Sequence, residues 1–147
     1  MLLHGSCAAL AGEGVLLLAP PGGGKSDLLL RLLGHGWDLV ADDQVTLEAE
    51  DGELRASPPP VLAGRLEVFG LGLLAGLAWI PCRLRLVARL VPRAEVQRLP
   101  EPTPWAAMGA TLPLLNLNAT SASAPEILRR ALDVRAGRLI LTAGALA

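Results

Sequence analysis

The pattern of apolar and polar positions predicts that the chain begins with two strands and a helix. Residues 4–10 and 15–19 are mainly apolar and flank the turn sequence Ala-Gly-Glu-Gly, which is typical of a β-hairpin. Consecutive prolines and glycines at residues 20–24 then interrupt the pattern. Residues 26–34 form a leucine-rich stretch with an acidic residue near its start and a glycine at its end, so we expect a helix there.

The middle of the chain predicts further strands separated by turns. Residues 44–56 alternate around Asp51-Gly52, the two-residue turn of a second hairpin. By contrast, residues 92–111 contain several prolines, and we expect them to form a surface loop. The other segments with strand-like composition are residues 37–43, 65–69, 83–91 and 112–117.

A second helix is expected near the end of the chain. Ser123 and Glu126 have the spacing of a capping box, and Gly137 lies where a helix C-terminal stop belongs. The residues expected on one face of this helix are Ile127, Ala131 and Val134. We therefore expect residues 1–147 to form one α/β domain with a mixed β-sheet and flanking helices.

Composition narrows the classes of function. The longest apolar stretch, residues 71–82, is too short for a membrane span and contains Pro81. The N-terminus lacks the positive flank of a signal peptide, so a cytoplasmic protein without membrane contact is expected. Because the chain has a single lysine and few aromatic residues, we expect no nucleic-acid binding.

The only lysine, Lys25, lies in a glycine-rich segment between a predicted strand and a predicted helix. Residues 19–26 read Ala-Pro-Pro-Gly-Gly-Gly-Lys-Ser and fit the phosphate-binding P-loop pattern, except that Ala19 replaces its first glycine. Such a loop turns backbone N–H groups toward phosphate oxygens, its lysine reaches the β- and γ-phosphates, and its serine binds Mg²⁺. The expected nucleotide-binding residues are Pro21, Gly22, Gly23, Gly24, Lys25 and Ser26.

Two adjacent acids are the next candidates for chemistry. Asp42 and Asp43 end a predicted buried strand shortly after the P-loop, where ligands of α/β sheets bind. One carboxylate of such a pair can hold Mg²⁺ while the other takes a proton from an attacking hydroxyl. A histidine, His4, lies on the strand before the P-loop strand, and from spacing alone a structural role for it is the more common outcome.

These segments together resemble the catalytic domain of HPr kinase/phosphorylase, a bacterial regulator of sugar uptake. The similarity includes Leu-His-Gly at residues 3–5, the P-loop followed closely by Val-Ala-Asp-Asp at residues 40–43, and Leu-Glu-Val-Phe-Gly-Leu-Gly at residues 66–72. It continues more weakly toward the C-terminus. The resemblance implies a P-loop kinase fold of the HPr kinase and PEP carboxykinase-like type. The chain looks like the short form found in some proteobacteria, and no separate N-terminal domain is expected.

The resemblance also implies an activity. The family transfers the γ-phosphoryl group of ATP to a serine of the phosphocarrier HPr, and phosphorolysis with inorganic phosphate reverses the modification. By this similarity Asp42 is the base and acid, Asp43 its companion, and His4 the active-site histidine. Ser26, Asp43 and Glu67 would lie at the Mg²⁺ site, with Lys25 at the nucleotide. The implied partners are an HPr-like protein and further copies of the chain in a hexamer.

One departure from the family pattern concerns the signature around Glu67. The family has an arginine where this chain has Phe69, and an arginine beside a transferring phosphoryl group stabilises its charge. Arg65 shares a face with Glu67 in a strand, which suggests the hypothesis that Arg65 substitutes in part. Two alternatives to the kinase therefore stay open: a nucleotide-sensing module of the same family with weak or no catalysis, and a small-molecule kinase.

Overall fold

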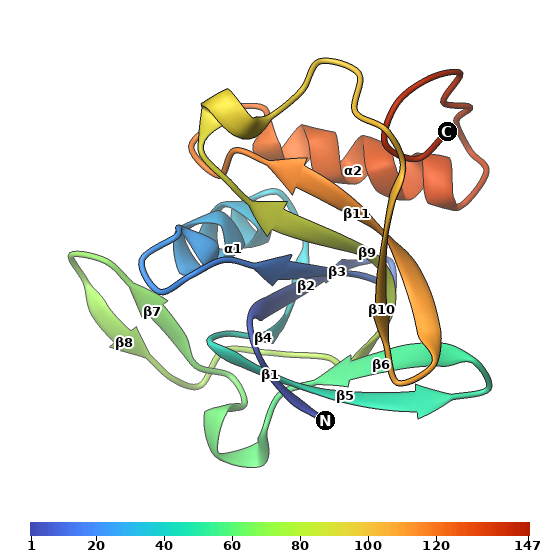
Figure 1. The fold of residues 1–147 in the computed structure, drawn as a ribbon. Helices are drawn as coiled ribbons and strands as arrows, with labels where there is room; N and C mark the ends of the chain where they lie inside the picture. Colours follow the sequence, from blue (N-terminus) through green and yellow to red (C-terminus); the bar gives the residue numbers. More distant parts are fainter.

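The computed structural model describes residues 1–147, which form a curled β-sheet with two helices on one side (Figure 1). The helices are α1 (Lys25–Gly34) and α2 (Ala124–Arg135), with short 3₁₀ turns at Pro60–Leu62 and Arg93–Glu95. The strands, in chain order, are β1 (Leu2–His4), β2 (Ser6–Leu10), β3 (Glu13–Leu18), β4 (Asp38–Ala41), β5 (Gln44–Glu50), β6 (Glu53–Ser57), β7 (Leu66–Val68), β8 (Gly72–Leu74), β9 (Cys82–Leu90), β10 (Thr103–Ala107) and β11 (Ala110–Leu117).

The large sheet is mixed, and its parallel strands lie together. Its order is β1-β5-β6-β9-β3-β2-β4, and β11 joins the sheet by pairing with both β9 and β10. Strands β3, β9 and β11 are parallel, so their carboxyl ends meet at one edge. Since α1 follows β3 after a short loop, that loop lies at the edge where α/β proteins bind ligands. The α/β class and the mixed sheet predicted from the sequence are confirmed.

Apolar residues form two cores, one on each face of the sheet. One core lies between the sheet and the two helices, and the other lies inside the curl that β5, β6 and β11 close. Helix α1 turns Leu28, Leu29 and Leu32 into the first core, which matches the spacing of an amphipathic helix. Neither helix has the length and apolar composition that a membrane crossing requires.

The hairpin predicted around Asp51-Gly52 is confirmed. Strands β5 and β6 pair in antiparallel register, and both turn residues have positive φ, 52° and 78°. A two-residue turn with both φ values positive matches the right-handed twist of the flanking strands.

The prediction of one continuous strand over residues 4–10 is wrong. Gly5 separates β1 from β2, so β1 pairs with β5 whereas β2 pairs with β3 and β4. The Gly5 N–H donates to the Asp43 carbonyl oxygen at 3.0 Å, and a Cβ at Gly5 would lie 3.0 Å from the Leu17 carbonyl oxygen. The break therefore places His4 and Ser6 on different strands around the end of β4.

The loop predicted over residues 92–111 is also wrong, because it contains β10 and the start of β11. Strand β10 pairs only with β11, and Pro104 lies opposite Pro113 in that pair. Proline lacks a backbone donor and is tolerated on an edge strand, where one side of the strand needs no partner. Pro104 and Pro113 therefore lie in an edge strand and its partner, and not in a loop.

Two details of the predicted last helix differ. Ser123 makes no capping hydrogen bond, because its hydroxyl pairs with the Ser121 hydroxyl at 3.0 Å. The face predicted to be buried is confirmed for Ala131 but is shifted overall: Leu128 and Leu132 enter the core, whereas Ile127 is exposed. The helix packs against the sheet through the face that contains Leu128, and Ile127 instead lines a surface groove.

Packing of α1 against the sheet gives a stability prediction. Leu28→Ala removes a fully buried side chain and should lower the free energy of unfolding by about 2–5 kcal/mol. Leu30→Ala on the same helix changes a side chain that is partly exposed and should cost less than about 1 kcal/mol. Chemical denaturation of both variants measures the difference, and equal losses would show that α1 does not pack as described.

Candidate functional site

The P-loop turns tightly at the end of β3. Gly22 and Gly24 have φ values of 76° and 92°, which glycine adopts without strain. Gly23 donates its N–H to the Pro20 carbonyl oxygen at 2.9 Å, whereas the N–H groups of Gly22, Gly24, Lys25 and Ser26 find no acceptor within the chain. Free amides at the N-terminus of a helix form an anion-binding site, because the helix dipole adds positive potential there.

The Lys25 ammonium group lies inside this site without an anionic partner. Lys25 is only 7% exposed, its Nζ donates to the Ala19 carbonyl oxygen at 3.1 Å, and no carboxylate lies within ion-pair distance. A buried charge is normally paired, since desolvation without compensation is costly. The sequence-predicted lysine is therefore a buried cation beside free amides, an arrangement that suits an anionic ligand.

His4 bridges Lys25 and Asp43. Its Nε2 lies 3.4 Å from Lys25 Nζ, and its Nδ1 lies 3.6 Å from Asp43 Oδ1. Because an ammonium group only donates, this geometry makes Nε2 an acceptor and places the proton of neutral His4 on Nδ1, toward Asp43. Asp43 itself has a φ of 69°, a conformation that aspartate tolerates better than most residues.

Asp42 is the buried carboxylate of the site. Its Oδ1 accepts hydrogen bonds from the Ser6 and Ser26 hydroxyls at 2.7 and 2.8 Å, and its Oδ2 accepts from the Glu67 backbone N–H at 3.2 Å. Asp42 is 7% exposed and has no cationic partner. The carboxylate is thus held in place by neutral donors, which leaves its charge uncompensated beside the P-loop.

Residues near Glu67 form a hairpin, β7–β8, that follows the site. The strand predicted over residues 65–69 is shorter, Leu66–Val68, and the glycine-rich segment after it turns into β8. The side chains of Arg65, Glu67 and Phe69 are exposed, as expected for alternate positions, and Phe69 is 99% exposed. The structure therefore brings the Glu67 backbone, and not its carboxylate, into contact with Asp42.

The oxygen donors of this site suit a hard divalent cation. Hydroxyl and carboxylate oxygens are the ligands that Mg²⁺ prefers, and Ser26 supplies one next to Asp42. No group of three or more His, Cys, Asp or Glu side chains is close enough together to chelate a metal. Mg²⁺ can be bound through one or two carboxylates, with the remaining coordination supplied by phosphates and water.

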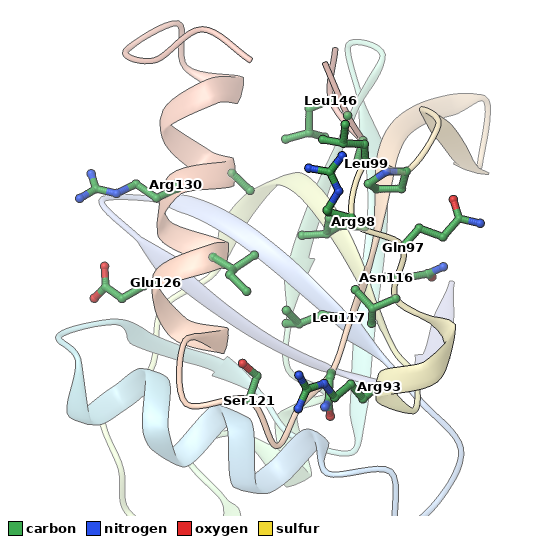
Figure 2. A pocket seen from close by; sticks show the side chains of 18 of the residues that line it. Arg93, Gln97, Arg98, Leu99, Asn116, Leu117, Ser121, Glu126, Arg130 and Leu146 are labelled. Atoms are coloured by element: carbon green, nitrogen blue, oxygen red, sulfur yellow. The ribbon is translucent and has the colours of Figure 1, made fainter. Parts of the chain in front are cut away.

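A large cavity of the protein lies elsewhere. It has a volume of about 1280 Å³ and lies between α2, β11, the segment after β9 and the C-terminal residues (Figure 2). Arg93, Arg98 and Arg130 reach its rim, whereas none of the predicted site residues lines it. The candidate site around the P-loop is therefore distinct from this groove.

Sequence reasoning missed Ser6 and Arg31. The Ser6 hydroxyl donates to Asp42 and accepts from the Asp43 N–H at 3.3 Å, so it fixes both acids. Arg31 donates to the carbonyl oxygens of Ala119 and Ser121 and holds that turn against Gly24. The only sequence signal for Ser6 was a polar residue in an otherwise apolar predicted strand, and the sequence contained none for Arg31.

Gly23 gives a test of the loop conformation. In Gly23→Ala the new Cβ would lie 2.6 Å from Ala19 Cβ and 2.8 Å from the Pro20 carbonyl oxygen, so the loop has to open. We expect phosphate-ligand affinity to fall by at least about tenfold, as measured by calorimetry. The matched control Gly34→Ala adds a Cβ in open space at the end of α1 and should leave affinity unchanged. Unchanged affinity in both variants would contradict this loop as the binding site.

The first half of the chain, residues 1–78, matches the sequence model of the HPr Serine kinase C-terminal domain. The chain belongs to this family. The relatives include the HPr kinase/phosphorylase of Clostridium tetani, 43% identical over 72 residues, which are 49% of this chain and 24% of that protein. The HPr kinase/phosphorylase of Burkholderia cenocepacia is 41% identical over 108 residues, which are 67% of this chain and 34% of that protein.

Structural comparison agrees with the family at the level of the fold. The Hpr(Ser) kinase/phosphatase of Coxiella burnetii has a TM-score of 0.79 to this chain, with 94% of this chain and 97% of that chain aligned. Sequence identity in that alignment is 21%, so the similarity establishes the fold. The matched segments span about a quarter to a third of the length of the two curated relatives.

Proposed function

We propose that the chain is an ATP-dependent serine kinase that modifies an HPr-like phosphocarrier protein and also catalyses the reverse phosphorolysis. One observation carries the proposal: Lys25 and Asp42 are both buried without an ion-pair partner, and Ser26, the neighbour of Lys25 in the chain, donates its hydroxyl to Asp42. A phosphoryl group entering between them would compensate the lysine charge, and an attacking hydroxyl would give the carboxylate a proton. Family membership supports the same reaction.

The phosphate-binding residues have separable tasks in this proposal. The free N–H groups of Gly22, Gly24, Lys25 and Ser26 hold the β- and γ-phosphate oxygens of ATP, and Pro21 and Gly23 shape the loop. Lys25 exchanges its contact with the Ala19 carbonyl oxygen for phosphate oxygens. His4 keeps the ammonium group aimed at the loop and is itself oriented by Asp43.

The proton is moved by Asp42. The seryl hydroxyl of the acceptor attacks the γ-phosphorus, the bond from the γ-phosphorus to the bridging oxygen breaks, and ADP leaves. Asp42 takes the hydroxyl proton as the new P–O bond forms. In phosphorolysis an oxygen of inorganic phosphate attacks the phosphoserine phosphorus, pyrophosphate forms, and Asp42 returns its proton to the seryl oxygen.

The proposal includes a Mg²⁺ ion bound beside the P-loop. The residues that would hold Mg²⁺ are Ser26, Asp43 and Glu67, and the ion would neutralise phosphate charge. Because the Ser26 hydroxyl donates to Asp42 in this structure, that hydrogen bond has to break when Ser26 becomes a ligand.

We also propose a cytoplasmic location and assembly into a homo-oligomer, which is a hexamer by resemblance to the family. Sedimentation velocity tests the assembly.

The test of the function is phosphorylation of the HPr-like protein from the same organism. Incubation with ATP and Mg²⁺, followed by mass spectrometry, should show one phosphoryl group on a serine, and later addition of phosphate should remove it. If a known HPr kinase modifies the same acceptor and this chain does not, the kinase proposal is wrong. Retained ATP binding in that case would favour the nucleotide-sensing alternative, which the exposed Phe69 at the signature arginine position also favours.

A further inference from the structure

Arg31 connects helix α1 to the turn that follows β11. Its Nη1 donates to the Ser121 carbonyl oxygen at 3.3 Å, and its Nη2 donates to the Ala119 carbonyl oxygen. Its Nε donates to Asp27 Oδ2 at 3.1 Å, one helical turn earlier on α1. One side chain therefore holds two carbonyl groups of residues 118–121, called the Ala119 turn below.

The Ala119 turn lies at the same edge of the sheet as the P-loop. Strands β3 and β11 are both parallel to β9, so the segments that follow their carboxyl ends meet at one edge. In Figure 2 the turn that carries Ser121 lies beside α1. Arg31 thus links the P-loop helix to residues that are 88 and 90 positions away in the sequence.

The side chain of Ala119 lies against Gly24, the last glycine of the P-loop. A Cβ built on Gly24 would lie 3.2 Å from Ala119 Cβ, so the Ala119 methyl group faces the Gly24 backbone directly. Gly24 has a φ of 92°, and its N–H finds no acceptor within the chain. Ala119 is itself buried in the core between the sheet and the helices. The turn therefore supports the backbone of a P-loop residue whose amide is free to bind phosphate.

Arg31 is the only donor to the Ala119 carbonyl oxygen, since no backbone N–H reaches that oxygen. A backbone carbonyl that loses its donor turns toward water or toward another free N–H. The free N–H groups of the P-loop are close by, because Ala119 touches Gly24. Without Arg31 the turn would lose two of its hydrogen bonds and its fixed position on the P-loop.

We propose that Arg31 is a positioning residue for nucleotide binding, which holds the Ala119 turn against Gly24 and so keeps the P-loop amides in place for phosphate. This proposal rests on the proposed function, in which those amides hold the phosphates of ATP. All three guanidinium nitrogens of Arg31 donate to groups of the chain, so Arg31 acts through the turn and not by touching the nucleotide. A loop that is ordered before binding gives higher affinity, because the ligand does not have to order it.

The test compares Arg31→Met and Arg31→Lys with Arg129→Met as the matched control. Arg129 is exposed on α2, so its replacement removes the same charge and leaves the Ala119 turn intact. Calorimetry measures binding of a non-hydrolysable ATP analogue with Mg²⁺, and transfer kinetics are measured in parallel. We expect Arg31→Met to weaken analogue binding and raise the KM for ATP by about tenfold, with kcat within about threefold of wild type. Arg31→Lys keeps a cationic donor and should recover part of this loss, whereas the control should bind as wild type.

A second comparison separates positioning from a general loss of stability. Leu54→Ala removes a fully buried side chain from the other core, inside the curl of the sheet, and should destabilise the fold more than Arg31→Met does. Measured well below the melting temperature of each variant, Leu54→Ala should keep its affinity for the analogue within about threefold of wild type. A role of Arg31 in stability alone would instead make the affinity loss follow the loss of stability.

The outcomes distinguish this proposal from the kinase proposal. If wild type binds the analogue but transfers no phosphoryl group, the kinase proposal fails, and weak binding by Arg31→Met still supports the positioning role. Wild-type affinity in Arg31→Met, or an equal loss in Leu54→Ala, would overturn the positioning role while transfer persists. Absence of analogue binding by wild type would overturn both proposals.

Discussion

Replacing Lys25 with methionine is expected to weaken ATP binding by at least about a hundredfold and to abolish phosphoryl transfer. The ammonium group is the only side-chain cation in the loop, and no neighbouring lysine exists to replace it. Titration calorimetry with ATP and Mg²⁺ measures the binding, and label transfer to the acceptor measures the activity.

Lys25→Met is also expected to keep or increase the thermal stability of the protein. Methionine keeps the length of the side chain but removes a buried charge that has no carboxylate partner, so the melting temperature should stay equal or rise. Arg55→Met removes an exposed charge on β6 and is the matched control, with no expected effect on binding. Retained ATP binding in Lys25→Met, or a marked loss of stability, would contradict the description of Lys25 as an uncompensated ligand-binding cation.

Asp42→Asn should separate chemistry from binding. An amide cannot take the seryl proton, so transfer is expected to fall by about 10²–10⁴-fold, which is the usual contribution of a positioned base. The side-chain carbonyl oxygen of the introduced asparagine would still accept a hydrogen bond from Ser6 or Ser26, and ATP affinity should therefore stay within a few-fold of wild type.

Its control lies on the same strand. Asp38→Asn changes an exposed acid at the start of β4, removes the same charge from the chain and should leave transfer unchanged. Quantitative label transfer at saturating ATP gives the comparison. Equal rates for Asp42→Asn and wild type would remove Asp42 from its role as the base, and equal losses in both variants would point to net charge as the cause.

The parts of this site that the sequence predicted are local along the chain. The P-loop lies between a strand and a helix, and the two acids follow the next strand, so strand, loop and helix signals alone placed Lys25, Ser26 and Asp42 together. The fold class followed from the same signals and from the resemblance. Glycines with positive φ were also predictable, because a tight phosphate loop requires them.

The parts that were missed depend on contacts between distant residues. The hydrogen bond between Ser6 and Asp42 joins residues 36 positions apart, at the end of the pairing between β2 and β4. Strand β10 was not predicted because it contains a proline, which indicates a loop in most sequences but is tolerated on an edge strand. The capping box failed because the Ser121 hydroxyl competes for Ser123. None of these outcomes is visible in a single segment.

The decisive experiment is a structure of the chain with a non-hydrolysable ATP analogue and Mg²⁺ bound. We expect the β- and γ-phosphates to lie on the free amides of the P-loop, with Lys25 Nζ moved from the Ala19 carbonyl oxygen onto phosphate oxygens. We also expect Ser26 to leave Asp42 for the metal and the Asp42 carboxylate to face the γ-phosphate. A nucleotide bound in the groove beside α2, with Lys25 still on the Ala19 carbonyl oxygen, would contradict this expectation.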